Sequence, residues 1–169
     1  MSTTQRLYSK AFAFLDSDNR GSNVHTGSQV TLRTYESRLL VKFERLPDQF
    51  RFKRISGAQL FFYFLATEGS YDWYDAHANT KEFDEKTATW DTWNEAGYNL
   101  VFQRKGVGNA PVWAEFPSAS ILFGDAVTYG IRLQSSLLNA KPFTVQTSGA
   151  NRPYLVLTID ESATADTLN

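Results

Sequence analysis

The sequence predicts an all-β protein, a single jelly-roll-like β-sandwich of about ten short strands. Three observations lead to this prediction. Short segments with alternating apolar and polar residues recur along the chain, turn-forming residues separate them, and helical periodicity is weak throughout. Aromatic residues, which favour strands, make up 15% of the 169 residues. We therefore expect one domain over residues 1–169, with short polar termini at 1–9 and 161–169.

Alternation and turn signals give the strands of the first half. A continuous apolar run at Ala58–Leu65 is typical of a central strand buried on both faces, and Ser56–Gly57 before it favours a turn. The polar segment Thr67–Lys81 is expected to be a loop. The expected strands here are Leu7–Leu15, Gln29–Thr34, Ser37–Phe43, Phe50–Ile55 and Ala58–Leu65.

Five more short strands are expected in the second half. They are Asn99–Gln103, Val112–Phe116, Thr128–Leu133, Phe143–Thr147 and Tyr154–Ile159. Between the two halves, Phe83–Asn94 holds two of the four tryptophans, and alternation over Thr87–Trp93 predicts a strand with one tryptophan on each side. The predicted core consists of Leu39, Val41, Phe43, Leu60, Phe62, Trp90, Tyr129, Ile131, Leu155 and Leu157.

Composition excludes several classes of protein. The net charge of −1 provides no global field toward nucleic acid or anionic lipid, so we expect neither partner. The absence of cysteine excludes disulfides, thiolate metal sites and thiol nucleophiles. No apolar run reaches the length of about 18 residues that a membrane helix needs. The N-terminal residues lack the apolar core of a secretory signal, and we expect a complete chain.

The termini themselves are poor in apolar residues. Ser2–Ser9 and Ser162–Asn169 contain too little apolar surface to become ordered by themselves. If they are ordered, we expect a partner chain to hold them.

Three segments, in this order, resemble one family. They are Ser37–Phe43 continuing to Tyr63, Phe83–Asp91, and Asn151–Thr158, and the similarity extends over about Asn19 to Thr158. Together they resemble the DNRLRE-type β-sandwich domains of bacterial and phage proteins. Phe83 stands where the family usually has tryptophan, and the proline that commonly follows is missing after Asn94. The resemblance implies a non-enzymatic jelly-roll module of surface, carbohydrate-associated or particle-associated proteins, and carries over no binding site.

The polar residues favour neither an enzyme nor a metal centre. His25 and His77 lie in separate segments without a second ligand type at helical spacing, so we predict no zinc site and no catalytic residues. Asp16, Asp18 and Asn19 could line a structural Ca²⁺ site, because hard cations prefer clustered oxygens, but they lack the pattern of an EF-hand loop. We otherwise expect no cofactor.

The best candidate contact is an aromatic segment within the expected loop. Tyr71, Trp73 and Tyr74 alternate there with Asp72 and Asp75. Sugars stack on aromatic faces while polar neighbours meet their hydroxyls, so the segment could bind a glycan. The interpretation that we favour over glycan binding is that these aromatic residues cap the fold or contact a neighbouring subunit.

These observations predict a non-catalytic structural or attachment module of a larger assembly. The expected location is the surface of a phage or virus particle, as a head decoration, fibre or tail-associated protein. The expected partners are other subunits of the same assembly, including copies of the chain itself. The alternative is a carbohydrate-binding module that binds a polysaccharide through its loop aromatics.

Overall fold

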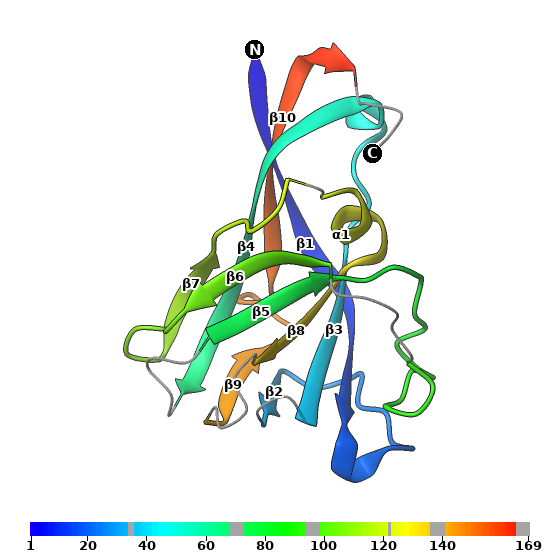
Figure 1. Ribbon diagram of the computed structural model, residues 1–169, viewed down its shortest axis with the longest axis vertical. Helices are drawn as coiled ribbons and strands as arrows, with labels where there is room; N and C mark the ends of the chain where they lie inside the picture. The colour runs from blue at the N-terminus through cyan, green and yellow to red at the C-terminus, as the bar shows by residue number, and fades with distance from the viewer. Residues whose placement is uncertain (34–35, 68–72, 94–98, 122, 136–140, 165–169) are drawn as a thin grey trace.

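The protein is all-β, as the sequence predicts. The computed structural model describes residues 1–33, 36–67, 73–93, 99–121, 123–135 and 141–164. In these residues ten strands form one antiparallel sheet in the order β2-β9-β4-β10-β1-β3-β8-β5-β6, with β7 paired to β4 (Figure 1). The strands are β1 (Ser2–Asp16), β2 (Gln29–Leu32), β3 (Ser37–Phe43), β4 (Lys53–Thr67), β5 (Trp73–Ala78), β6 (Leu100–Lys105), β7 (Val112–Phe116), β8 (Ile131–Ser135), β9 (Phe143–Gln146) and β10 (Tyr154–Thr164). The assignment to the jelly-roll type within this class stays a prediction.

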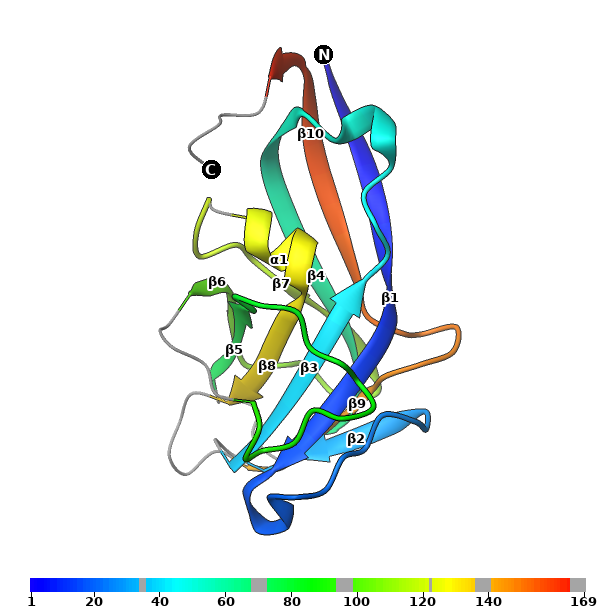
Figure 2. The ribbon, with the colours of Figure 1, turned by 90° about the vertical axis from the view of Figure 1, so that its right-hand side faces the viewer.

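The long strand β1 joins the two halves of the sheet. Its N-terminal half pairs with β10 over Ser2–Tyr8, and its C-terminal half pairs with β3 as far as Asp16. The register shifts between Ser9 and Ala11, where β1 passes from one half to the other. The sheet folds over at this point, so that β4 and β7 face β3, β8 and β5 (Figures 1 and 2).

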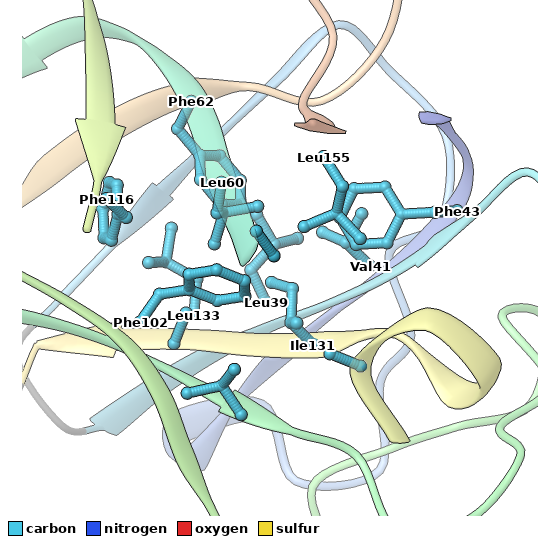
Figure 3. Close-up of a cluster of buried hydrophobic side chains, with 14 of the residues drawn as sticks. Leu39, Val41, Phe43, Leu60, Phe62, Phe102, Phe116, Ile131, Leu133 and Leu155 are labelled. Carbon is cyan, nitrogen blue, oxygen red and sulfur yellow. The ribbon is translucent and has the colours of Figure 1, made fainter. Parts of the chain in front are cut away.

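The main core fills the space between the two halves. Side chains from β4 and β7, such as Phe62 and Phe116, meet side chains from β8 and β6, such as Leu133 and Phe102 (Figure 3). Eight of the ten predicted core residues are buried, whereas Trp90 and Tyr129 are half-buried. Alternation thus identified most inward positions, because successive strand residues point to opposite faces.

β4 is longer than the sequence predicts. Lys53 to Thr67 form one strand, so the expected turn at Ser56–Gly57 is wrong. Gly57 lies opposite Thr158, and the register of β10 shifts directly after Thr158. A glycine in a strand often marks such an irregularity rather than a turn.

The strand expected over Phe50–Ile55 is wrong in its first half. Asp48–Phe50 form a single 3-10 turn, and Phe52 is 68% exposed in the bend before β4. Phe50 is buried in the main core, which draws this turn onto the inner face of the sheet. The expected strand over Thr128–Leu133 also begins too early, because the short helix α1 (Gly124–Tyr129) precedes β8.

The N-terminal residues are ordered within the chain itself, contrary to expectation. Ser2–Tyr8 form ladder pairs with β10, from Ser2 opposite Asp160 to Tyr8 opposite Tyr154. The prediction failed because it considered apolar content alone, whereas ladder hydrogen bonds and the burial of Leu7 hold the strand. Residues 165–169 lie outside the described part of the chain. No helix in the described residues is long and apolar enough to cross a membrane.

Candidate functional site

The loop expected over residues 67–81 is a strand from Trp73 to Ala78. The loop prediction is therefore wrong for these residues. Tyr71 and Asp72, which belong to the predicted contact segment, lie outside the described residues. The alternation of this strand was weak in the sequence, because Trp73 is at an outward position and two of the three inward residues are alanines.

Tyr74 is a core residue. It is 0% exposed, and its ring meets the rings of Phe143 and Phe64 edge-on at centroid distances of 4.8 Å and 5.2 Å. Its hydroxyl lies 3.0 Å from the hydroxyl of Thr67. A fully buried ring cannot stack on a sugar, so Tyr74 is unsuited to the role predicted for it.

The other two described members of the predicted segment point outward from β5. Asp75 is 6% exposed and accepts a hydrogen bond of 2.8 Å from Nε2 of Gln103 on β6. Trp73 is half-buried, and the ammonium group of Lys105 lies 5.8 Å from the centroid of its ring. Its role as a ligand or partner contact stays a prediction.

No strand forms over Phe83–Trp93, contrary to expectation; Asn94 lies outside the described residues. Local hydrogen bonds replace the ladder. The carbonyl of Asp84 accepts bonds from the N–H groups of Thr87 and Ala88, and the hydroxyls of Thr89 and Thr92 each accept a bond from the other residue's N–H. Asp and Thr side chains close such turns readily and so compete with strand pairing.

This turn-rich segment covers the outer side of β1 and β3 and creates a second core. Phe83, Ala88 and Trp93 pack there against Ala13, Leu15 and Leu40. Lys42 anchors the segment, because its ammonium group donates to the carbonyl of Phe83 at 2.7 Å and pairs with Glu85 at 3.0 Å. Both tryptophans therefore face β3, and the prediction that they lie on opposite sides of a strand is wrong.

Two ionisable residues are buried on the same side of the sheet. His77 on β5 is the cross-strand partner of Arg132 on β8, and the two residues are 5% and 4% exposed. Burial, together with the positive charges of Arg132 and Arg38, lowers the pKa of His77 to about 4. Burial and Arg38 also lower the pKa of Arg132 to about 10. The imidazole is therefore neutral at pH 7.

The candidate calcium loop is neutralised by an arginine. The guanidinium group of Arg33 pairs with Asp16 and lies 2.9 Å from Asp18. No group of three or more His, Asp or Glu side chains in the described ranges is arranged to hold a metal ion. A groove of about 560 Å³ beside β1 brings together Lys10, Arg45 and Arg51, but Asp48 and Glu82 offset their charge.

A different surface stands out on the outer side of β1, β10, β4 and β7. Five rings that point away from the main core lie together there, flanked by two arginines. We call this surface the outer aromatic face. It comprises Tyr8, Phe61, Tyr63, Trp113 and Tyr154, with Arg6 and Arg152.

The register of the strands places these rings in contact. Tyr8 lies opposite Tyr154, Tyr154 opposite Phe61, and Tyr63 opposite Trp113. Tyr154 and Phe61 stack at 4.7 Å with 14° between their planes, and Trp113 meets Tyr63 edge-on at 5.2 Å. Cross-strand aromatic pairs of this kind stabilise a sheet by up to about 1 kcal/mol each.

Arginines and polar groups complete the outer aromatic face. The guanidinium carbon of Arg6 lies 4.4 Å from the centroid of Tyr154, and that of Arg152 lies 4.5 Å from Tyr8. On the other side, Nε2 of Gln59 donates to Glu115 at 2.7 Å. The face thus has an apolar centre with cations along β1 and a carboxylate on β7.

Trp113 is the most accessible of the five rings of the outer aromatic face. Its side chain is 37% exposed, although the sheet beneath it is fully packed. Large apolar side chains that gather on one exposed face commonly mark an interaction surface. The sequence alone missed this face, because its residues come from four strands far apart along the chain. Aromatic residues at both alternating positions of Leu60–Leu65 were the signal that could have revealed it.

No family model matches the chain, and no curated protein matches it at a significant level. The resemblance to the DNRLRE-type domains therefore stays a prediction that rests on the quoted motifs.

Proposed function

We propose that the protein is a non-catalytic attachment module that binds other subunits of a larger assembly through its outer aromatic face. The observation that carries this proposal is the composition of that face. Tyrosine, tryptophan and arginine are the residues that contribute most to binding energy at protein interfaces. Here Arg6 lies over the ring of Tyr154, which in turn meets Trp113 edge-on.

The geometry of the rings favours a protein partner. Tyr154 lies between Phe61 on one side and the guanidinium group of Arg6 on the other, so both of its faces are already covered. Its position is held by these contacts, and little side-chain entropy remains to be lost when a partner binds. A ring whose two faces are covered cannot stack on a sugar, so Tyr154 suits a packed protein surface better than a glycan.

A phage or virus particle is the assembly that we propose, with the protein as a head decoration, fibre or tail-associated subunit at the particle surface. The aromatic content is high for one core of this size. The outer aromatic face accounts for part of this surplus, and burial against neighbouring subunits would remove it from water.

A carbohydrate-binding module is the second candidate. Trp113 is the observation that favours it, because its exposed indole lies on the strand that also carries Glu115, which is hydrogen-bonded to Gln59. An exposed ring beside carboxylate and amide groups can stack on a sugar and bind its hydroxyls.

Trp113→Ala separates the two candidates. Association with partner subunits, measured by light scattering and sedimentation, should weaken by about 2 kcal/mol or more, about 30-fold, if Trp113 is an interface anchor. A glycan array should show no specific binding. Phe52→Ala, which removes an exposed ring outside this face, is the matched control and should leave association unchanged. Saturable binding of the wild type to a polysaccharide that is lost in Trp113→Ala would contradict the proposal and support the second candidate.

A further inference from the structure

The N-terminal half of β1 is an unpaired edge of the sheet. In both views, β1, β10 and β4 extend beyond the other strands as a three-stranded arm (Figures 1 and 2). Within the arm, β1 pairs with β10 from Ser2 to Tyr8, but its pairing with β3 begins only at Ser9. Among the described segments, no strand pairs with the other side of Ser2–Tyr8.

Two hydrogen bonds show which backbone groups point to this edge. Ser9 N–H donates to the carbonyl of Pro153, toward β10, at 2.9 Å. Tyr8 N–H donates to Oε1 of Glu44 at 3.1 Å, on the opposite side. Because the backbone groups of successive strand residues alternate in direction, every second residue before Tyr8 faces the open edge. These residues are Ser2, Thr4 and Arg6.

The edge lacks the features that usually prevent strand addition. Ser2–Arg6 contains no proline and no bulge, and its residues other than Arg6 are uncharged. The guanidinium group of Arg6 lies over the ring of Tyr154 on the face of the sheet, away from the edge. The Arg6 carbonyl accepts a long bond of 3.4 Å from the side chain of Gln5, which a partner strand can replace.

We propose that this edge pairs with the same edge of a second copy of the chain, antiparallel, about a two-fold axis at Thr4. This register places Thr4 opposite Thr4 and Ser2 opposite Arg6, and it is the register that pairs all three open residues. If the axis were shifted along β1 toward Tyr8, the pairing would need the backbone groups of Tyr8, which Glu44 already binds. A larger shift of the axis would bring Arg6 opposite Arg6. Threonine pairs across antiparallel strands are favourable, whereas like charges are not.

The dimer joins the two arms into one continuous sheet. Because hydrogen-bonded residues opposite each other carry their side chains on the same face, the outer aromatic faces of both copies lie on one side. The dimer therefore presents two copies of this face to a partner surface. Two linked sites bind a multivalent surface more tightly than either site alone. The pairing itself does not depend on the proposed function.

Thr4→Pro tests the edge with little effect on the fold. Proline removes an N–H that points away from β10, a position at which an edge strand tolerates it. By light scattering, the wild type and the control Thr4→Ala should have twice the monomer mass of 19.1 kDa, whereas Thr4→Pro should have the monomer mass. A monomeric wild type, or Thr4→Pro with the same mass as the wild type, would overturn the proposal.

A cross-linking measurement covers the case in which Thr4→Pro fails to fold. The chain has no cysteine, so a single introduced thiol reports only on its own position. Thr4→Cys should form a disulfide-linked dimer rapidly under mild oxidation, because the paired Cα atoms would lie about 5.5 Å apart. The exposed Thr128→Cys should form it slowly. Equal rates for the two variants would contradict the pairing.

The same samples keep this inference separate from the proposed function. Trp113→Ala should keep the dimer mass, because Trp113 lies on β7. That strand is separated from β1 by β4 and β10. Loss of the dimer in Trp113→Ala, together with its retention in Thr4→Pro, would assign self-association to the outer aromatic face and reject the edge.

Discussion

The indole of Trp113 meets the ring of Tyr154 edge-on across β4, at a centroid distance of 5.2 Å and an angle of 61°. The strands that carry them, β7 and β10, do not pair with each other; each pairs with β4. This contact links the aromatic pairs on either side of β4 into one surface. The two faces of β4 can therefore be tested independently by mutation.

Adjacent residues of β4 should differ in their contribution to stability. Phe62 is 0% exposed and contacts Phe116 in the main core, so Phe62→Ala should lower the free energy of unfolding by about 3–5 kcal/mol. Phe61 points outward and is half-buried, so Phe61→Ala should cost about half as much or less. Chemical denaturation measures both. A loss below about 1 kcal/mol for Phe62→Ala would contradict the position of the core.

Gly130 should be irreplaceable where helix α1 meets β8. Its φ is +90°, and a Cβ at this position would collide with the backbone carbonyl of Val41. Gly130→Ala should therefore destabilise strongly, by about 3 kcal/mol or more, because a backbone atom cannot move aside easily. Gly124→Ala, within α1 and with nothing near its Cβ position, should be neutral or stabilise by up to about 1 kcal/mol. Thermal melts of the two variants that shift equally would refute this account.

His77 should make the fold sensitive to acid within a defined pH range. Its pKa is about 4 in the folded protein, compared with 6.5 for an unperturbed histidine, the value taken for the unfolded chain. The unfolded chain therefore binds the proton first, and stability should fall as the pH drops from 6.5 to 4, by at most about 3 kcal/mol. Urea denaturation at pH 7.5, 6 and 5 measures this. His77→Gln should show a flatter profile over this range, and an equally steep one would show that other groups are responsible.

The turn-rich segment over Phe83–Trp93 should detach before the main core unfolds. Trp93 is 4% exposed and packs on Phe83, so Trp93→Ala should open the segment to proteases and to hydrogen exchange. Trp90 is half-buried and lies 4.4 Å from the guanidinium group of Arg38, so Trp90→Ala should have a smaller effect. If Trp93→Ala loses protection against hydrogen exchange at the same rate in this segment and in β3, the two unfold as one unit and the prediction is contradicted.

Strands with an apolar inner side and a polar outer side were predicted well from the sequence. Ser37–Phe43 and Val112–Phe116 match β3 and β7 at both ends. The strand at Trp73–Ala78 was missed because its inner positions give a weak apolar signal, since Ala76 and Ala78 follow Tyr74. Asp75 and His77 favour a loop in the sequence, although both are buried in the structure.

The candidate surface was also beyond the reach of sequence patterns. The sequence prediction assigned the aromatic residues in excess of the core to a contact surface, and it placed them at Tyr71, Trp73 and Tyr74 in one loop. The outer aromatic face instead depends on which residue of one strand lies opposite which residue of the next. That register is set by the fold of the whole sheet.

Protection of the outer aromatic face within the proposed assembly is the most direct test of the central claim. Hydroxyl-radical footprinting compares the isolated protein with the protein in the proposed particle. Tyr8, Trp113 and Tyr154 should oxidise much more slowly in the particle, whereas Phe52, 68% exposed and outside this face, serves as the internal reference. Equal oxidation of Trp113 in the free and assembled states would contradict the account.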